Sequence, residues 1–247
     1  MFNSTIDRIK QLAEKYPERI KELEWILDRP TNVYIDFANV YRWQEKLGWH
    51  IDLKRLKQLL GSFDTIKEIK FYDGTLVGKQ ESEDFINQTR RYGYIVITKP
   101  VKTIRISLDV SSIPPDSPAI LKEFIREPLL RKFNIETVIL LNSKLKELNQ
   151  QGILFIEDLK CNFDVEISTD MMIDHHLKKA ENFILWSGDS DFADTLKQLL
   201  DAGKKVVLFA TPRRVSAELN ALRSNRLIIF DIQKIREFIC WPKEMKP

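Results

Sequence analysis

The chain has 247 residues, of which 43% are hydrophobic and 30% charged, and its formal net charge is +3. This length suits one large globular domain or a domain with an appendage, and the composition excludes the disordered and fibrous classes. No uncharged apolar run is long enough to cross a bilayer, and charges interrupt the first residues, so we expect a cytoplasmic protein without a membrane partner. The 2 cysteines and 3 histidines lack zinc-site spacing, so any metal is expected to have oxygen ligands.

The apolar periodicity predicts helices and short strands that alternate along most of the chain. Residues 4–28 are predicted to be helical and to form an N-terminal extension over 1–30. Strands are predicted at 33–37, 66–72, 94–98, 182–187, 205–210 and 227–230, and helices at 53–60, 81–92, 171–179, 191–201, 212–223 and 233–239. This alternation predicts an α/β fold with a central, mostly parallel sheet and helices on both faces.

The middle of the chain interrupts this alternation, and we interpret about 101–159 as an insertion. A strand is predicted at 102–110, a helix at 119–133 and two further strands at 137–141 and 153–156. The main domain is then expected over 31–233, and a C-terminal helix and tail over 234–247.

Aspartates follow two of the predicted strands. Asp36 ends the first strand, Asp189 and Asp191 follow strand 182–187, and Asp170 is expected to start helix 171–179. Because the carboxyl ends of parallel strands meet at one edge, we expect these four side chains to converge there. Converging carboxylates need a cation, and oxygen-only ligation is typical of Mg²⁺ or Mn²⁺ with a phosphate substrate. N-capping of the next helix is the alternative for Asp189 and Asp191.

Three segments resemble the NYN domain of the LabA-like (DUF88) type, within the PIN-like nuclease superfamily. They are Tyr34–Asn39 (YIDFAN), Lys160–Val165 (KCNFDV) with Asp170 beyond it, and Ser187–Phe192 (SGDSDF). The resemblance covers about 32–230 and implies a Rossmannoid, PIN-like fold. It also implies a ribonuclease, expected to be an endoribonuclease, that uses Mg²⁺ or Mn²⁺ to cleave single-stranded or structured RNA.

The resemblance carries over to individual residues. It implies metal-binding and catalytic roles for Asp36, Asp170, Asp189 and Asp191, with Asn39 and Asp164 in support. Ser187 and Ser190 flank the Asp pair, and we expect them to hydrogen-bond a carboxylate or a phosphate. The chain departs from the family pattern at Phe37-Ala38-Asn39 and has one extra residue after Lys160.

Basic and aromatic residues near the strand ends are candidates for RNA contacts. Arg213 and Arg214 follow strand 205–210 and are expected to meet RNA phosphates, with Lys160 as a further candidate. Tyr41 and Trp43 follow Asn39 and are candidates for stacking on bases, with core packing as the alternative.

Two other functions stay open at this point. One is an RNA-binding regulatory module with weak or no cleavage, because the same acids would bind metal there. The other is a haloacid-dehalogenase-like phosphatase, suggested by Asp73-Gly74-Thr75, although Thr75 stands where that chemistry needs an acid. A homo-oligomer is also left open, and the N-terminal helices are one candidate for a dimer contact.

Overall fold

The computed structural model describes residues 1–211 and 214–245 and divides the chain into two compact units. Unit 1 comprises Met1–Pro100 and Asn162–Pro247, and unit 2 comprises Val101–Cys161. Among the described residues, no helix is both long and apolar enough to span a membrane.

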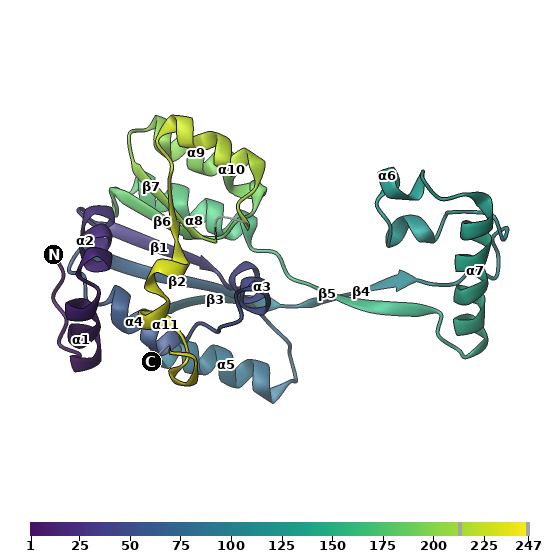
Figure 1. Cartoon of the computed structure of the whole chain (residues 1–247), viewed down its shortest axis with the longest axis horizontal. Coiled ribbons are helices and arrows are strands. Elements are labelled where there is room, and N and C mark those ends of the chain that lie inside the picture. Colours follow the sequence, from purple (N-terminus) through teal and green to yellow (C-terminus); the bar gives the residue numbers. More distant parts are fainter. Residues whose placement is uncertain (212–213, 246–247) are drawn as a thin grey trace. The chain divides into compact units, whose positions relative to one another are not determined.

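Unit 1 is built on a six-stranded sheet with the order β3-β2-β1-β6-β7-β8 (Figure 1). Its strands are β1 (Thr31–Asp36), β2 (Ile66–Thr75), β3 (Ile95–Pro100), β6 (Asn182–Trp186), β7 (Lys205–Ala210) and β8 (Ile228–Asp231). Every neighbouring pair is parallel. The central strands β1 and β6 are buried at every residue, as expected for apolar strands covered on both faces. The predicted α/β class with a parallel sheet is confirmed.

Helices lie on both faces of this sheet. They are α1 (Asp7–Lys15), α2 (Pro17–Ile26), α3 (Phe37–Leu47), α4 (Leu53–Leu60), α5 (Gln80–Arg91), α8 (Asp164–His176), α9 (Ala193–Asp201), α10 (Ala217–Ala221) and α11 (Arg236–Ile239). Figure 1 shows α8, α9 and α10 on one side and α4, α5 and α11 on the other. On the α5 side, Phe37 and Phe71 join α3 to β2, with ring centroids 4.9 Å apart.

Most predicted elements of unit 1 are present. Helix α4 has the predicted bounds, because the Asp52 carboxylate accepts a hydrogen bond from the N–H of Arg55 at 3.0 Å. Strand β7 also has the predicted bounds. Of the helix predicted at 212–223, residues 212 and 213 lie outside the described residues; α10 begins at Ala217 after the Ser216 cap, and a 3-10 turn follows at Leu222–Asn225. The helix predicted at 233–239 is shorter, because a 3-10 turn takes Ile232–Ile235.

Two helix starts differ from the prediction. Helix α3 was not predicted; it begins directly after Asp36, whose carboxylate caps it by accepting the N–H of Asn39 at 3.3 Å. Helix α8 begins at Asp164 instead of residue 171, because the Asn162 side chain accepts the N–H of Asp164 at 2.9 Å. Asp170 therefore lies six residues into α8 and does not start a helix.

Unit 2 contains a two-stranded antiparallel ribbon and a small helical part. The ribbon pairs β4 (Lys102–Ser107) with β5 (Phe155–Lys160), and the helices are α6 (Glu127–Leu130) and α7 (Ile135–Gln150). The helix predicted at 119–133 is wrong, because Pro128 has no N–H and is tolerated only in a first helical turn, which divides the stretch. The strand predicted at 137–141 is also wrong. Its apolar run lies within α7, which Asn134 caps by accepting the N–H of Thr137 at 2.9 Å.

Candidate active site at the ends of β1 and β6

The strand order creates a topological switch point between β1 and β6. From β1 the chain moves outward through β2 to β3, and it later returns to β6 beside β1 before moving outward in the other direction. Ligands in open parallel sheets bind beyond the carboxyl ends of the strands at such a point. Asp36 is the last residue of β1, and Ser187, Gly188 and Asp189 directly follow β6, so the sheet delivers them to the same edge.

Ser187 joins the two strand ends. Its hydroxyl donates to Oδ2 of Asp36 at 3.1 Å, and Oγ of Ser187 accepts the backbone N–H of Asp189 at 3.3 Å. Ser187 and Asp36 are buried, with 0% and 7% of their surface exposed. The buried hydroxyl thus holds Asp36 and the Asp189 backbone in one fixed arrangement.

Gly188 allows a close approach between two loops. A Cβ atom at this position would lie 1.9 Å from the carbonyl oxygen of Arg214, which is far inside contact distance. The Gly188 carbonyl also accepts the N–H of Ser216 at 3.1 Å. The segment after β7 therefore lies against the turn after β6, which brings the backbone of Arg214 to the edge of the site. Arg213 lies outside the described residues.

Burial and neighbouring negative charges raise the pKa of two carboxylates at this edge, Asp36 and Asp164. Burial raises the pKa of Asp36 to about 6, and the charges of Asp164 and Asp189 add to the rise. The hydrogen bonds from Asn39 and Ser187 oppose it. Burial also raises the pKa of Asp164, and the negative charges of Asp189 and Asp191 raise it further. Asp36, Asp164, Asp189 and Asp191 therefore form one group, called here the rim acids, that shares a negative potential.

A fifth acid lies near the rim acids. Burial raises the pKa of Asp73 to about 7, and the nearby charge of Asp36 adds to the rise. The Asp73 carboxylate accepts the N–H of Gly74 at 2.9 Å. In the sequence, Asp73 stands out only as part of a phosphatase-like motif. Its place near the end of an apolar strand beside β1 is the signal that could have identified it.

Asp170 has different partners from the rim acids. Its Oδ2 accepts the hydroxyl of Tyr72 at 2.6 Å and lies 3.9 Å from Nζ of Lys70. Lys70 in turn donates to Asp174 at 2.7 Å, and Asp174 also accepts the Tyr34 hydroxyl at 2.7 Å. These contacts fix α8 against β1 and β2. Asp164, at the start of the same helix, is the acid of α8 that interacts with Asp189 and Asp191.

The remaining candidate residues differ in their exposure and in the part of the fold that carries them. Tyr41 is 57% exposed, whereas Trp43 is 3% exposed and packs in the core. The stacking role considered for Trp43 is therefore withdrawn, since a base cannot reach its ring.

Lys160 belongs to unit 2, where it is paired opposite Lys102 in the ribbon. Ser190 lies in a 3-10 turn, Ser190–Phe192, which Asp189 caps by accepting the N–H of Asp191 at 3.3 Å.

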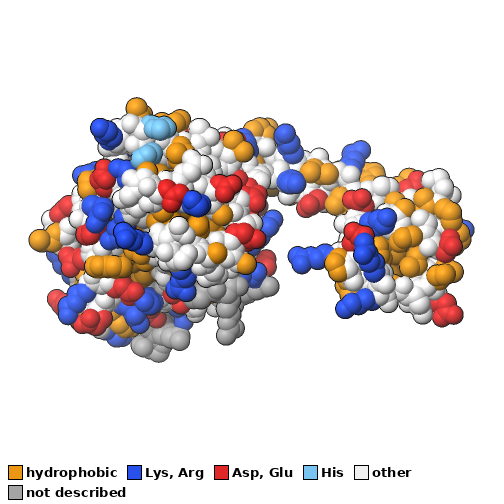
Figure 2. Space-filling view, turned by 90° about the horizontal axis from the view of Figure 1, so that it is seen from above, with side chains coloured by type: hydrophobic (Ala, Val, Ile, Leu, Met, Phe, Trp, Pro, Cys, Tyr) orange, Lys and Arg blue, Asp and Glu red, His pale blue; other side chains and the backbone are white. Residues whose placement is uncertain are grey.

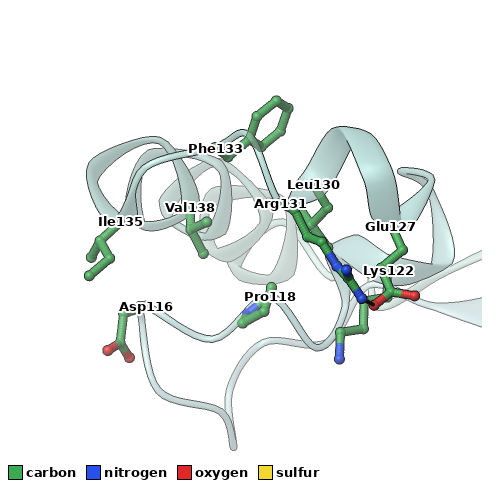
Figure 3. Close-up of a pocket in the computed structure, with 9 residues that line it drawn as sticks. All are labelled: Asp116, Pro118, Lys122, Glu127, Leu130, Arg131, Phe133, Ile135 and Val138. Carbon is green, nitrogen blue, oxygen red and sulfur yellow. Dashed lines mark hydrogen bonds and ion pairs between the residues drawn. The ribbon is translucent and has the colours of Figure 1, made fainter.

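Surface hollows are found in both units. One, in unit 1, is next to the rim acids and is lined by Asn162, Asp164, Val165, Ser168, Thr169 and Asp191. The other lies in unit 2 (Figure 3), where Lys122, Glu127 and Arg131 lie together at one side and Asp116 and Ile135 at the other. Glu127 and Arg131 form an ion pair at 2.6 Å, so their charges compensate each other.

The chemistry of the rim acids fits a divalent cation. The Asp36 carboxylate is buried, and its hydrogen-bond donors are a neutral N–H and a neutral hydroxyl. Carboxylate oxygens are the ligands that Mg²⁺ and Mn²⁺ prefer, and a cation would relieve the repulsion within the group. Within residues 1–211 and 214–245, no three His, Cys, Asp or Glu side chains are grouped closely enough to hold a metal as they stand.

The parallel six-stranded sheet with helices on both faces is consistent with a PIN-like fold. The NYN domain family model matches residues 121–231, and the NYN family belongs to the PIN-like nuclease superfamily. The matched stretch includes Asp164, Asp189 and Asp191 but not Asp36. Members of this family are generally nuclease-like and commonly bind RNA, and PIN-like nucleases typically use divalent metals.

A solved structure with a similar fold is the crystal structure of VPA0982, a protein of unknown function from Vibrio parahaemolyticus. It is 16% identical, with a TM-score of 0.51 over 85% of this chain and 95% of that one. At this identity the similarity concerns the fold alone. No match was found among curated proteins.

Proposed function

We propose that the protein is a metal-dependent endoribonuclease that hydrolyses RNA phosphodiester bonds at the edge formed by β1 and β6. The observation that supports it most is the link from Asp36 through Ser187 to Asp189 at the switch point. Asp164 and Asp191 lie close enough to act electrostatically on the same group. A shared negative potential at a ligand-binding edge favours a cation and a phosphate substrate over an apolar ligand.

The proposed metal ligands are the rim acids Asp36, Asp164, Asp189 and Asp191. A bound Mg²⁺ or Mn²⁺ would supply charge neutralisation and Lewis-acid chemistry at the phosphate. Ser187 and the backbone N–H of Asn39 hold the Asp36 carboxylate in place, and Asp189 is held by its own capping contact. We propose Asp170 as a positioning residue, because its carboxylate already accepts the Tyr72 hydroxyl. Ser190 is proposed as a hydrogen-bond donor to the phosphate.

RNA binding requires cations and stacking surfaces outside this acidic group. Arg214 is proposed to contact RNA phosphates, because its backbone lies against Gly188 at the edge of the site. Arg213 is proposed from its sequence position alone. Tyr41 is exposed in α3, about one turn beyond the helix start that Asp36 caps, and is proposed to stack on a base.

The test is incubation of the purified protein with labelled single-stranded and structured RNA in parallel reactions with Mn²⁺, Mg²⁺ and EDTA. The proposal expects internal cleavage with either metal, none with EDTA, and none by the Asp189→Asn variant. RNA binding without cleavage would support the regulatory-module alternative instead. Hydrolysis of a phosphate monoester that is lost in Asp73→Asn but not in Asp189→Asn would support the phosphatase alternative.

A further inference from the structure

Unit 2 exposes an unusually large share of apolar side chains. Of the twenty large hydrophobic residues that are exposed in the described chain, eleven belong to Val101–Cys161. The core of its helical part is a small cluster of Leu121, Leu130 and Val138, with partly buried neighbours around them. Figure 2 shows hydrophobic side chains spread over the surface of this unit. Exposed apolar surface of this kind marks an interaction surface.

The ribbon of unit 2 is exposed on both faces. All six residues of β5 and five of the six in β4 are exposed. Isolated two-stranded ribbons are marginally stable in water, and stable sheets have three or more strands or a covering element. The exposed residues include Ile104, Ile156 and Leu159, at 42%, 41% and 52%. The ribbon therefore has both an open edge and an apolar surface available to a partner.

The charges on the ribbon indicate what that partner carries. Lys102 and Lys160 are directly opposite each other, and Asp158 is opposite the uncharged Ile104. Like charges directly opposite in a sheet repel. Within the described residues, the ion pair of the ribbon joins Arg105 and Glu157, and Lys102, Asp158 and Lys160 have no such partner. A partner with an acid opposite Lys160 and a base opposite Asp158 complements this strand.

We propose that the open edge of β5 pairs antiparallel with β5 of a second copy of the chain, around a two-fold axis at Leu159. The N–H of Leu108 donates to the carbonyl of Leu154 at 2.9 Å, one step beyond the paired strands. Antiparallel hydrogen bonding alternates every second residue, so Ile156, Asp158 and Lys160 bond to β4. The backbone groups of Phe155, Glu157 and Leu159 therefore point to the open edge.

The charged residues of β5 favour an axis at Leu159 over an axis at the neighbouring residues. With the axis at Leu159, the two Leu159 residues form a hydrogen-bonded pair, and Asp158 of each copy lies opposite Lys160 of the other. These charged pairs are of the non-hydrogen-bonded type, in which the Cα atoms are only about 4.5 Å apart. An axis at Glu157, Asp158 or Lys160 would place a charge opposite its own copy, and an axis at Ile156 brings no opposite charges together. Strand β4 has two cations and no acid, so its edge offers no such pair.

The resulting contact is isologous and joins the two ribbons over residues 158–160, the part of β5 that this register brings together in both copies. It gives Leu159 a second hydrogen-bonded neighbour and gives Lys160 an acidic partner. This inference does not depend on the proposed nuclease activity, since it concerns unit 2 alone.

The first test measures self-association of the full-length protein by size-exclusion chromatography with light scattering and by sedimentation velocity. The wild type is expected to form a dimer, and Asp158→Lys and Lys160→Asp are each expected to weaken dimerisation at least about tenfold. The double variant Asp158→Lys/Lys160→Asp restores the opposite charges and is expected to restore the dimer. A wild type that is monomeric at all concentrations, a dimer unaffected by both single changes, or association only on addition of RNA would overturn the proposal.

The second test maps the axis by cross-linking in a Cys161→Ser background, which removes a neighbouring thiol. Leu159→Cys is expected to form an interchain disulfide under mild oxidation, because the two copies of residue 159 face each other. Ile156→Cys is the matched control on the same strand. In this register its two copies are six residues apart along the sheet, about 20 Å, and stay reduced. Cross-linking at residue 156 equal to that at 159 would contradict the register.

Discussion

The hydroxyl of Ser187 lies 3.1 Å from the Asp36 carboxylate, although 151 residues separate the two in sequence. This contact exists because β6 returns beside β1 after the chain has built β2, β3 and unit 2. Both partners are buried, so the contact is set by the sheet and does not depend on mobile surface side chains. It places the sequence motifs around Asp36 and Asp189 in a single site.

The buried state of Asp36 predicts how stability depends on pH. Its pKa is about 6 in the folded chain against an ordinary value of 3.8, so the folded state keeps a proton that the unfolded state releases between these values. Stability is therefore lost as pH rises through this window, by up to about 3 kcal/mol. Asp36→Asn removes this loss. Without divalent metal, we expect the variant to be about 1–3 kcal/mol more stable near pH 8, the lost hydrogen bonds offsetting part of the gain.

Urea unfolding with EDTA at both ends of this pH range measures the effect. The advantage of Asp36→Asn is expected to shrink towards about pH 4 and to disappear below about pH 3, where both states hold the proton. Asp73→Asn is the matched control, because Asp73 is partly buried and burial likewise raises its pKa, to about 7. We expect both variants to gain stability at high pH, but only Asp36→Asn to lose RNA cleavage. A destabilised Asp36→Asn at high pH would show that its carboxylate is stabilised by contacts other than those described.

The close contact at Gly188 predicts a strong effect of one added methyl group. In Gly188→Ala the new Cβ would lie 1.9 Å from the Arg214 carbonyl oxygen, so the two loops must separate. We expect a loss of about 2–4 kcal/mol in the free energy of unfolding and a loss of RNA cleavage. Gly203→Ala is the control, because a Cβ there meets open space although φ is +76°. It is expected to cost about 1 kcal/mol and to leave cleavage intact. Equal thermal stability of the two variants would argue against the tight loop contact.

The alternation of helices and strands was predictable because it depends on local patterns. Asp52 and the apolar run after it were enough to place α4, and the buried β7 was placed from its composition. Unit 2 was predicted poorly, since the β-branched residues of α7 favour a strand while the cap at Asn134 favours a helix. The sequence periodicity alone does not decide between a strand and a helix for this stretch.

The site was predictable only where topology fixes it. The convergence of Asp36 and Asp189 was predictable because residues at the ends of parallel strands meet at one edge whatever their side-chain contacts. Asp170 was misplaced because the capping turn at Asn162, which starts α8 early, was not recognised. The ion pair of Lys70 with Asp174 could not be predicted, because burial of a lysine within a strand depends on which helix covers it.

The different surroundings of Asp164 and Asp170 predict different effects on metal binding. Asp164 interacts with Asp189 and Asp191, whereas Asp170 accepts the Tyr72 hydroxyl and lies near Lys70. We expect Asp164→Asn to weaken Mn²⁺ binding at least about tenfold and Asp170→Asn to change it by less than about threefold. Isothermal titration calorimetry on the two variants measures this directly. The reverse order would return Asp170 to the ligand set that the sequence indicated and remove Asp164 from it.

The position of Arg214 predicts a change in the salt dependence of RNA binding. If its side chain neutralises a phosphate, Arg214→Glu removes one released counterion, so the slope of log affinity against log salt should fall by about one. The matched control is Arg29→Glu, because Arg29 precedes β1 at the opposite end of the strands and pairs with Asp28 at 2.8 Å. Both variants change the net charge equally, so a general electrostatic effect would alter both slopes. Fluorescence anisotropy with a labelled single-stranded RNA, in EDTA to prevent cleavage, measures the slopes. An unchanged slope for Arg214→Glu, or equal changes in both variants, would place the RNA-binding surface away from the loop after β7.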